Sequence, residues 1–270
     1  MKDYVKTNQE ILNEWQEEFI KDGGNQDLFC FDGIMFRGEA ERDAANNWVH
    51  KEGVNDNTLW ANAPVRILYL TKDQNTTEDA GAWDIRQESY HNPNSEYKDY
   101  ILWCKYAFHR KLVRSLYGLI KTKPETFIQY EDIDDSEALK YSDEYPYARI
   151  NCKKEAGGSN CPNNILKESM EKYSSLLTRQ ISNLEADIFI CCGNQNDNNE
   201  ILNFLNSHGY NFEWTDKDSY DVHYDSKKNI IAIDTYHLSS RHGNIAHYND
   251  IVFTYYEFLK KHPDLKKTHR

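Results

Sequence analysis

The hydrophobic residues of the chain fall into short apolar runs that alternate with longer stretches of helical spacing. Four runs are apolar on both faces and bounded by polar residues, as buried parallel strands are: 65–70, 147–150, 187–192 and 230–233. Helical spacing marks the opening stretch, which stops at Gly23-Gly24. The same spacing recurs in four later segments: 97–121, 163–183, 197–207 and 245–261.

Strands that alternate with helices predict βαβ units and a parallel sheet covered on both faces. We therefore expect an α/β fold, a three-layer α/β/α sandwich whose central, mostly parallel sheet has about four strands. Nothing in the middle of the chain resembles an interdomain tether, so residues 1–270 are interpreted as a single domain. Its core is expected at about 65–260, with an N-terminal extension over 1–64. A long loop is expected at 75–94 and a surface excursion at 124–145.

Composition favours a soluble, cytoplasmic protein. The first residues lack the basic start and apolar run of a secretory signal, and no stretch approaches the roughly 20 apolar residues of a membrane helix. The six cysteines form no CxxC pair, and Cys191 and Cys192 stand inside an apolar run. Free thiols in a reducing compartment are therefore expected. No spacing resembles a zinc or iron–sulfur site, so we expect no metal and no cofactor.

Charge is unevenly distributed along the chain. The net charge of −12 argues against a protein that binds nucleic acid through an overall positive charge, because binding to phosphates depends on lysine and arginine. Between residues 101 and 124, however, the charged residues are all basic. This segment is either a solvated helix face or a track for phosphates, and the sequence leaves both interpretations open.

Polar residues gather where the predicted strands end, which is where open parallel sheets bind their ligands. Asp73 follows the first core strand, Asn151 the second and His237 the fourth, while Gly193 follows the third. A carboxylate can orient a water or offset a developing cation, and an amide can pair with a planar base edge. An imidazole can donate a hydrogen bond to an oxygen that gains negative charge. Together these groups predict a catalytic site.

The segments that carry these residues resemble motifs of the uracil-DNA glycosylase superfamily. ILYLTKDQN places Asp73 where the family has its first motif, ARINCKK supplies the Asn after the second strand, and HLSSR is similar to the last motif. The resemblance covers about 65–260. Departures occur at Thr71, Gln74 and Leu238, where the family usually has Gly, Pro and Pro. The four-cysteine cluster of some members is missing, which argues against an iron–sulfur subtype.

The resemblance implies a DNA glycosylase that flips out a base and hydrolyses its N-glycosidic bond. In that mechanism His237 donates to the base carbonyl, Asn151 pairs with the base edge, and Asp73 orients the water and offsets the oxocarbenium charge. An aromatic side chain stacks on the extruded base. Three aromatic residues are candidates for that position: Trp83, Tyr90 and Phe108.

DNA is the expected partner. We expect the protein to act as a monomer and not to associate with a membrane. Six polar residues beside the strand ends are candidates for DNA contacts: Lys72, Lys153, Ser239, Ser240, Arg241 and His242. Arg241 is either a wedge that enters the gap left by the flipped nucleotide or one partner of a surface salt bridge. Lys72 and Lys153 either hold phosphates or are solvated. Gly193 either allows close approach of a ligand or serves a simple strand-to-helix turn.

The departures around Asp73 and the long 75–94 segment suggest a remodelled pocket. They favour a uracil-like or modified, bulkier pyrimidine base, in DNA repair or in defence against foreign modified DNA. An alternative is a catalytically inactive module of the same fold that binds nucleic acid or nucleotides. A generic small-molecule hydrolase is a further alternative. The sequence lacks the G-x-S-x-G, Walker and G-x-G-x-x-G signatures that such enzymes often carry.

Overall fold

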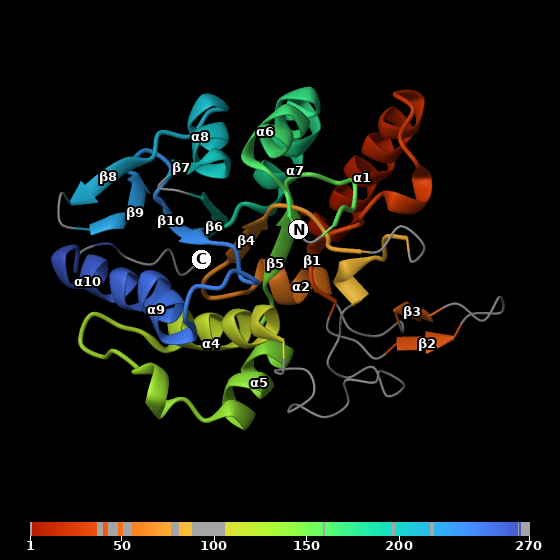
Figure 1. The fold of residues 1–270 in the computed structure, drawn as a ribbon. Coiled ribbons are helices and arrows are strands. Elements are labelled where there is room, and N and C mark those ends of the chain that lie inside the picture. The colour runs from red at the N-terminus through yellow and green to blue at the C-terminus, as the bar shows by residue number, and fades with distance from the viewer. Residues whose placement is uncertain are drawn as a thin grey trace.

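The chain folds around one large sheet, seen in a computed structural model (Figure 1). The structure describes residues 2–36, 40–42, 48–50, 56–76, 81–87, 106–158, 160–195, 198–216, 219–263 and 265. Four strands run parallel at the centre of the sheet, in the order β5-β4-β6-β10. They are β4 (Ile67–Thr71), β5 (Ala148–Asn151), β6 (Ile188–Gln195) and β10 (Ile230–Tyr236). These four confirm the predicted parallel core.

Antiparallel strands extend this core on both sides, so the sheet is mixed and larger than expected. β1 (Gly33–Ile34) pairs with β5, and β9 (Ser219–Asp225) and β8 (Glu213–Asp216) continue the sheet beyond β10. The short β7 (Asn198–Asn199) pairs with β6. Two further strands, β2 (Ala40–Arg42) and β3 (Trp48–His50), form a separate pair.

The β8–β9 hairpin escapes sequence prediction for a physical reason. Its residues, EWTDKDSYDVHYD over 213–225, mix aromatic and charged side chains. Antiparallel strands near a sheet edge need only one apolar face, so they lack the continuous apolar run that identifies buried parallel strands. The expectation of about four strands counted only strands buried on both faces.

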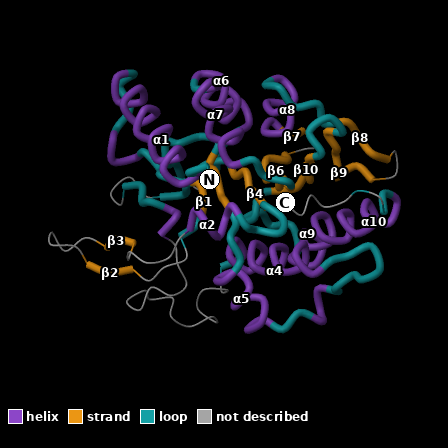
Figure 2. Tube along the Cα trace, turned by 180° about the vertical axis from the view of Figure 1, so that it is seen from behind, coloured by secondary structure: helices purple, strands orange, loops and turns teal. Residues whose placement is uncertain are grey.

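Helices cover both faces of the sheet (Figures 1 and 2). One face carries α1 (Tyr4–Lys21), α6 (Asn163–Lys172), α7 (Ser174–Leu184) and α8 (Glu200–Ser207). The other carries α4 (Ala107–Lys121), α5 (Asp135–Glu144), α9 (Asn244–Tyr248) and α10 (Thr254–Lys261). A π-helical turn, Asn249–Phe253, joins α9 to α10, and α2 (Asp56–Ala61) precedes β4. Short 3-10 turns occupy Gln26–Leu28, Ile85–Gln87 and Tyr130–Asp132.

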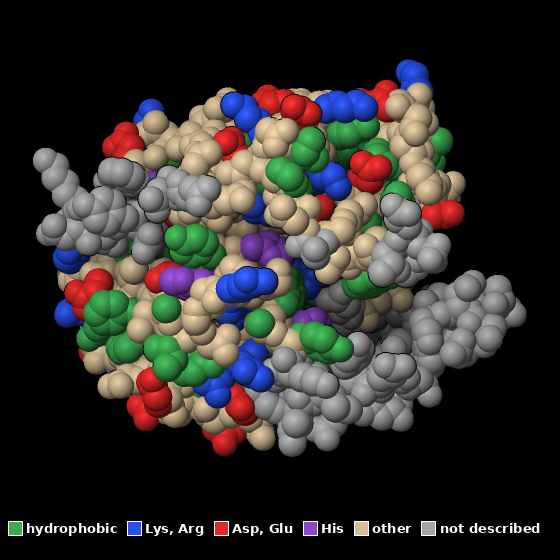
Figure 3. Space-filling model, viewed as in Figure 1, with side chains coloured by type: hydrophobic (Ala, Val, Ile, Leu, Met, Phe, Trp, Pro, Cys, Tyr) green, Lys and Arg blue, Asp and Glu red, His purple; other side chains and the backbone are tan. Residues whose placement is uncertain are grey.

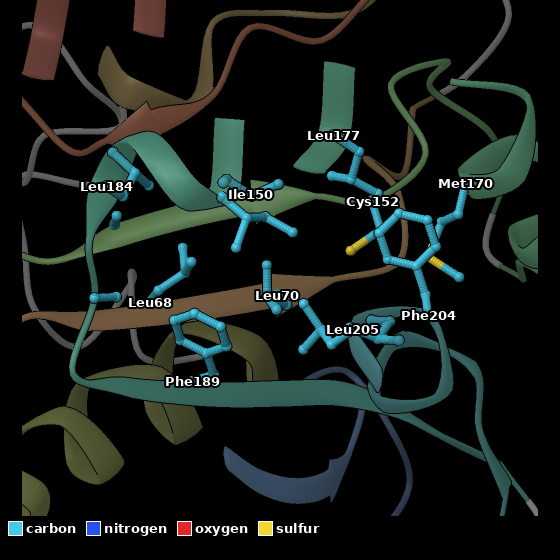
Figure 4. Close-up of a cluster of buried hydrophobic side chains, with 14 of the residues drawn as sticks. Leu68, Leu70, Ile150, Cys152, Met170, Leu177, Leu184, Phe189, Phe204 and Leu205 are labelled. Atoms are coloured by element: carbon cyan, nitrogen blue, oxygen red, sulfur yellow. The ribbon is translucent and has the colours of Figure 1, made fainter. Parts of the chain in front are cut away.

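Alternate residues of the central strands feed two separate hydrophobic cores. On β4, Leu68 and Leu70 belong to the core beneath α1, α6, α7 and α8, whereas Ile67 and Tyr69 belong to the core beneath α4 and α10. Figure 4 shows the first core, where the two leucines of β4 lie beside Ile150 of β5. Because both faces of β4 are covered, all five of its residues are buried, which explains the uninterrupted apolar run in the sequence.

The N-terminal segment is part of the same core. Trp15 of α1 is fully buried in the cluster that contains Leu68, and α1 packs against α7. Asp32 is fully buried and forms an ion pair with Lys154, which follows β5. The part of 1–64 that the structure describes therefore includes elements that complete the sheet and one of its layers.

Two predicted helical segments and the predicted surface excursion differ in detail from what is observed. The segment 163–183 contains two helices rather than one, with Tyr173 between them. The excursion at 124–145 includes α5. The helix expected at 97–121 begins at Ala107, and residues 97–105 lie outside the described part of the chain. None of the helices in the described ranges is long and apolar enough to cross a membrane.

Candidate functional site

The carboxyl ends of the four parallel strands form one edge of the sheet. The chain passes from β4 to β5 on one side and then to β6 on the other, so the strand order reverses between β4 and β6. Ligands of open α/β sheets bind in the crevice at such a reversal. Thr71 pairs with Asn151 across β4 and β5, while His237 directly follows β10, the strand beside β6. Asp73, two residues beyond Thr71, therefore lies along the same edge as Asn151 and His237.

His237 is held in one tautomer. Its Nδ1 accepts from the Ser239 backbone N–H at 3.3 Å and lies 2.7 Å from the Ser239 hydroxyl. An acceptor role for Nδ1 assigns the proton of the neutral ring to Nε2. Within the described part of the chain, Nε2 is buried and has no hydrogen-bond partner. The ring therefore presents an unused N–H donor.

Burial keeps this imidazole neutral. Burial first, and then the positive charges of Lys72, Arg149 and Lys111, lower the pKa of His237 from 6.5 to about 4. At neutral pH the ring is an uncharged donor surrounded by cations. Such a donor can stabilise an oxygen that gains negative charge without first losing a proton.

Asp73 lies just past β4 beside a lysine. Its Oδ2 is 3.3 Å from the Lys153 Nζ, and the two side chains are only 10% and 11% exposed. Burial raises the pKa of Asp73, while the Lys153 charge opposes that rise. Gly157 packs against the carboxylate, because a Cβ at that position would come within 2.7 Å of Oδ2. Lys153 also donates to the Glu155 carbonyl, so it serves Asp73 and its own loop rather than standing solvated.

Asn151 is buried and already bonded. Its Oδ1 accepts from the Thr71 hydroxyl at 2.6 Å, and its Nδ2 donates to the Cys30 sulfur at 3.2 Å. An amide oxygen has two lone pairs and an amide nitrogen two hydrogens, so one of each remains for a ligand. Thr71 thus has a defined contact: its hydroxyl orients the amide of Asn151.

The backbone of Asn151 is fixed by the buried ion pair. Its N–H donates to Asp32 Oδ2 at 2.8 Å, and its carbonyl accepts from the Lys154 Nζ at 2.9 Å. Lys154 donates to both carboxylate oxygens of Asp32, at 2.6 and 2.7 Å, and Gln180 donates to one of them. The N-terminal segment therefore supplies the carboxylate that holds the end of β5.

The loop after His237 is shaped by its own polar groups. Lys111 of α4 donates to the Ser240 carbonyl at 2.9 Å, and the His242 Nε2 lies 2.8 Å from Asp250. The His242 ring stacks on Tyr236, with centroids 4.8 Å apart. Together with the bond between Ser239 and His237, these contacts fix the loop. The side chain of Arg241 is exposed, and it forms no salt bridge within the described residues.

Two of the three aromatic candidates lie in the described structure, at different places. Phe108, at the start of α4, lies against the His237 ring with centroids 5.9 Å apart, and the Arg149 guanidinium lies over the Phe108 ring, 5.0 Å from its centroid. Trp83 is 46% exposed, and its backbone is hydrogen bonded to the side chain of Gln74 beside Asp73. Tyr90 lies outside the described residues. Phe108 is thus the aromatic that contacts the predicted catalytic histidine.

Gly193 is explained by packing. It lies within β6, and a Cβ there would come 2.4 Å from the Asn199 side-chain oxygen and 2.9 Å from Ile201. Asn199 caps α8 by accepting from the backbone N–H groups of Ile201 and Leu202. The missing side chain therefore makes room for the start of α8, which favours the structural interpretation of this glycine.

Sequence reasoning missed two cations of the site. Lys111 is 3% exposed and Arg149 is 6% exposed, and both act on His237. A signal for Arg149 exists, because a charged residue inside a short apolar strand needs a reason. Lys111 resembles the many other basic residues of its segment until α4 is placed against the sheet. Lys72, for which the sequence left open a phosphate contact or a solvated side chain, is only 9% exposed.

The charge of this region contrasts with that of the whole chain. In Figure 3, histidine and Lys or Arg side chains gather near the middle of the face, where the surface is hollowed. Within the described residues, no group of three or more His, Cys, Asp or Glu side chains is placed to hold a metal ion. The arrangement is suited to stabilising negative charge by hydrogen bonds and cations.

Comparison with known proteins gives no relative from which a function can be transferred. No protein-family model matches the chain, and no curated protein matches it at a significant level. A function must therefore be argued from the site and from the motifs.

A second buried histidine gives a test of the protonation states described here. His247 of α9 is fully buried, its Nε2 donates to the Tyr236 carbonyl, and burial lowers its pKa from 6.5 to about 4. The unfolded chain thus takes up a proton near pH 6.5 that the folded chain does not bind. Stability is complete above pH 6.5 and falls as the pH drops towards 4, by about 1.4 kcal/mol per pH unit for this residue.

His247→Gln is expected to remove the contribution of His247 to the pH dependence of the free energy of unfolding. Urea unfolding of the wild type and the variant between pH 7 and 5.5 gives both slopes, and the variant slope should be shallower by about 1 kcal/mol per pH unit on average, because the full slope is reached only well below pH 6.5. Equal slopes would mean that His247 is protonated in the folded protein.

Proposed function

We propose that the protein is a DNA glycosylase that excises a uracil-like or modified pyrimidine base by hydrolysis of the N-glycosidic bond. The observation that carries this proposal is the neutral His237, whose buried Nε2–H has no partner within the described residues and stands among cations at the strand edge. Breaking the bond leaves negative charge on the base and positive charge on the sugar. The neutral N–H of His237 can stabilise the negative charge on the base, and the carboxylate of Asp73 can stabilise the positive charge on the sugar.

The proposed roles follow the chemistry of each group. His237 donates its Nε2 proton in a hydrogen bond to the base carbonyl as that oxygen becomes anionic. Asp73 orients a water towards the sugar carbon and offsets the oxocarbenium charge. Asn151 pairs with the base edge through the lone pair and N–H that Thr71 and Cys30 leave unused. Phe108, beside His237, is the proposed stacking partner of the base.

DNA reaches this site only with the base out of the stack, because the glycosidic bond is not attackable inside the duplex. Arg241 is exposed at the rim and is the proposed wedge that fills the gap left by the flipped nucleotide. Ser239, Ser240 and His242 shape that loop, and their contact with DNA is proposed through the loop as a whole. Lys72 and Lys153 are proposed to act within the site rather than on exposed phosphates.

A base-release assay tests the proposal. Duplexes that carry uracil, hydroxymethyluracil, hydroxymethylcytosine or a glucosylated base are incubated with the protein, and abasic sites are cleaved with alkali. Release of at least one base, abolished by His237→Ala, is the expected result. If no base is released from duplex or single-stranded substrates, the glycosylase proposal fails.

The alternative, a binding module without turnover, has a specific observation in its favour. Asp73 is paired with Lys153, and the Asn151 amide is bonded to Thr71 and Cys30, so both groups are partly committed within the protein. A module of this kind would bind DNA or nucleotides at the same edge without releasing base. Binding to the same duplexes without cleavage would favour it.

A further inference from the structure

Two buried lysines near His237 bond only to neutral oxygens. Lys72 donates to the Asn163 side chain at 3.1 Å and approaches Gln195 and the Cys161 carbonyl at 3.5 Å. Lys111 donates to the Ser240 carbonyl and approaches its hydroxyl at 3.4 Å. Neither lysine forms a salt bridge with a carboxylate in the described part of the chain. Two of the three contacts of Lys72 are at the limit of a hydrogen bond, so its donors are underused.

Burying an ammonium group without a counterion is costly. Lys72 is 9% exposed and Lys111 is 3% exposed, and burial lowers the pKa of each. Most buried charges in proteins are paired, as Asp32 and Lys154 are. The more distant charges of Asp73 and Asp250 act on Lys72 and Lys111 respectively, but no carboxylate of the described residues lies within ion-pair distance of either ammonium group. The strand edge can therefore take an anion supplied from outside the protein as a direct partner of both lysines.

Positively charged side chains surround the unused N–H donor of His237. The charged side chains that act on His237 within the described residues are Lys72, Arg149 and Lys111, and all are cationic. The carboxylates nearest this edge already have partners: Asp73 has Lys153 beside it, and Asp250 lies 2.8 Å from the His242 Nε2. The helix α4 also begins here, since its second residue is Phe108, and its N-cap residue offers no side-chain hydrogen bond. A helix N-terminus adds partial positive charge.

We infer that the strand edge around His237, between Lys72 and Lys111, binds an oxyanion that the substrate carries. This inference rests on the proposed function for the identity of that substrate: because His237 faces the base, the oxyanion belongs to the base, and the excised base is an acidic pyrimidine such as one with a carboxylate. A neutral base would leave both ammonium groups without a directly bonded anion. A phosphate group offers the same chemistry and is the other source to be tested.

The experiment measures binding of small molecules to the full chain by calorimetry. The probes are uracil-5-carboxylate, its neutral carboxamide and inorganic phosphate. The carboxylate is expected to bind at least about tenfold more tightly than the carboxamide, because a charged hydrogen bond distinguishes them. Lys72→Met and Lys111→Met should each weaken carboxylate binding by about tenfold and weaken carboxamide binding far less, because only the carboxylate loses a charge-assisted hydrogen bond.

Lys121→Met is the matched control. Lys121 lies on the same helix as Lys111, but its Nζ is 3.6 Å from Glu137 and it is partly exposed. This variant should bind all three probes as the wild type does. Should Lys72→Met or Lys111→Met fail to fold, the comparison of carboxylate with carboxamide on the wild type still decides the matter.

The outcomes separate this inference from the proposed function. Preference for the carboxylate, with or without base release from DNA, supports the subsite, and phosphate that does not compete with the carboxylate supports the base as the source. Tight phosphate binding that is lost in both lysine variants, with no carboxylate preference, supports the oxyanion subsite but assigns it to a nucleotide phosphate. Equal affinity for carboxylate and carboxamide without phosphate binding, or no binding of any probe, overturns the inference even if base release is observed.

Discussion

Asp73→Asn is expected to lower the rate of base release by about 10²–10⁴-fold, the range over which a positioned acid or base contributes to catalysis. The variant keeps the size of the side chain and removes the charge that orients water and offsets the oxocarbenium ion. Single-turnover release from the best substrate of the wild type measures the effect. DNA affinity, measured separately, should change far less, since the carboxylate is proposed to act on the transition state.

The pH dependence gives a second readout of the same residue. Burial raises the pKa of Asp73 above its ordinary 3.8, and only the ionised form is proposed to act. Activity is therefore present above that raised pKa and is lost as the pH falls through it. The variant should lack this acid limb. His237, with a pKa of about 4, should add no inflection near pH 6.5.

Asp135→Asn serves as the control for loss of an ion-paired aspartate. Asp135 begins α5 and pairs with Arg114, away from the strand edge. Its variant should release base at the wild-type rate. A wild-type rate in Asp73→Asn would remove Asp73 from the proposed mechanism.

Asp32→Asn is expected to destabilise the protein by about 3–5 kcal/mol, the cost of leaving one member of a buried ion pair without its partner. Lys154 would retain its charge in a site where Asp32 is 0% exposed and Lys154 is 2% exposed. Since whole domains are stable by about 5–15 kcal/mol, the loss is large. Urea unfolding at neutral pH measures it.

A double variant separates the ion pair from other effects. Adding Lys154→Met to Asp32→Asn removes the stranded charge, so the double variant should be more stable than Asp32→Asn alone. Asp22→Asn, which breaks the exposed pair with Lys172, should cost far less. If the double variant were less stable than the single one, the charge of Lys154 would not be the cause.

The sequence predicts the parallel core and the sheet edge along which the candidate site residues lie, because both follow from local patterns. Runs apolar on both faces identify β4, β6 and β10, and the residues after parallel strands share an edge whatever the details of packing. The sequence alone therefore places Asp73, Asn151 and His237 along that edge. Which of these residues are neighbours depends on the order of the strands in the sheet. The alternation of strands and helices in the sequence does not determine that order.

The partners of those residues could not be predicted, because they come from distant segments. The sulfur beside Asn151 belongs to Cys30, and the ammonium group that holds the His237 loop belongs to Lys111 of α4. Neither contact leaves a local pattern in the sequence. Gly193 gave an ambiguous signal for the same reason, since the residue that needs the space is Asn199.

The bond from the Asn151 backbone to Asp32 bears on how the chain can be divided. A fragment that starts at residue 65 would contain the four parallel strands and every residue proposed to touch DNA. It would lack the carboxylate to which the end of β5 is bonded and the helix that covers Lys154. The shortest piece worth expressing therefore begins before α1, and any transplant of this site into another scaffold has to include the first 36 residues.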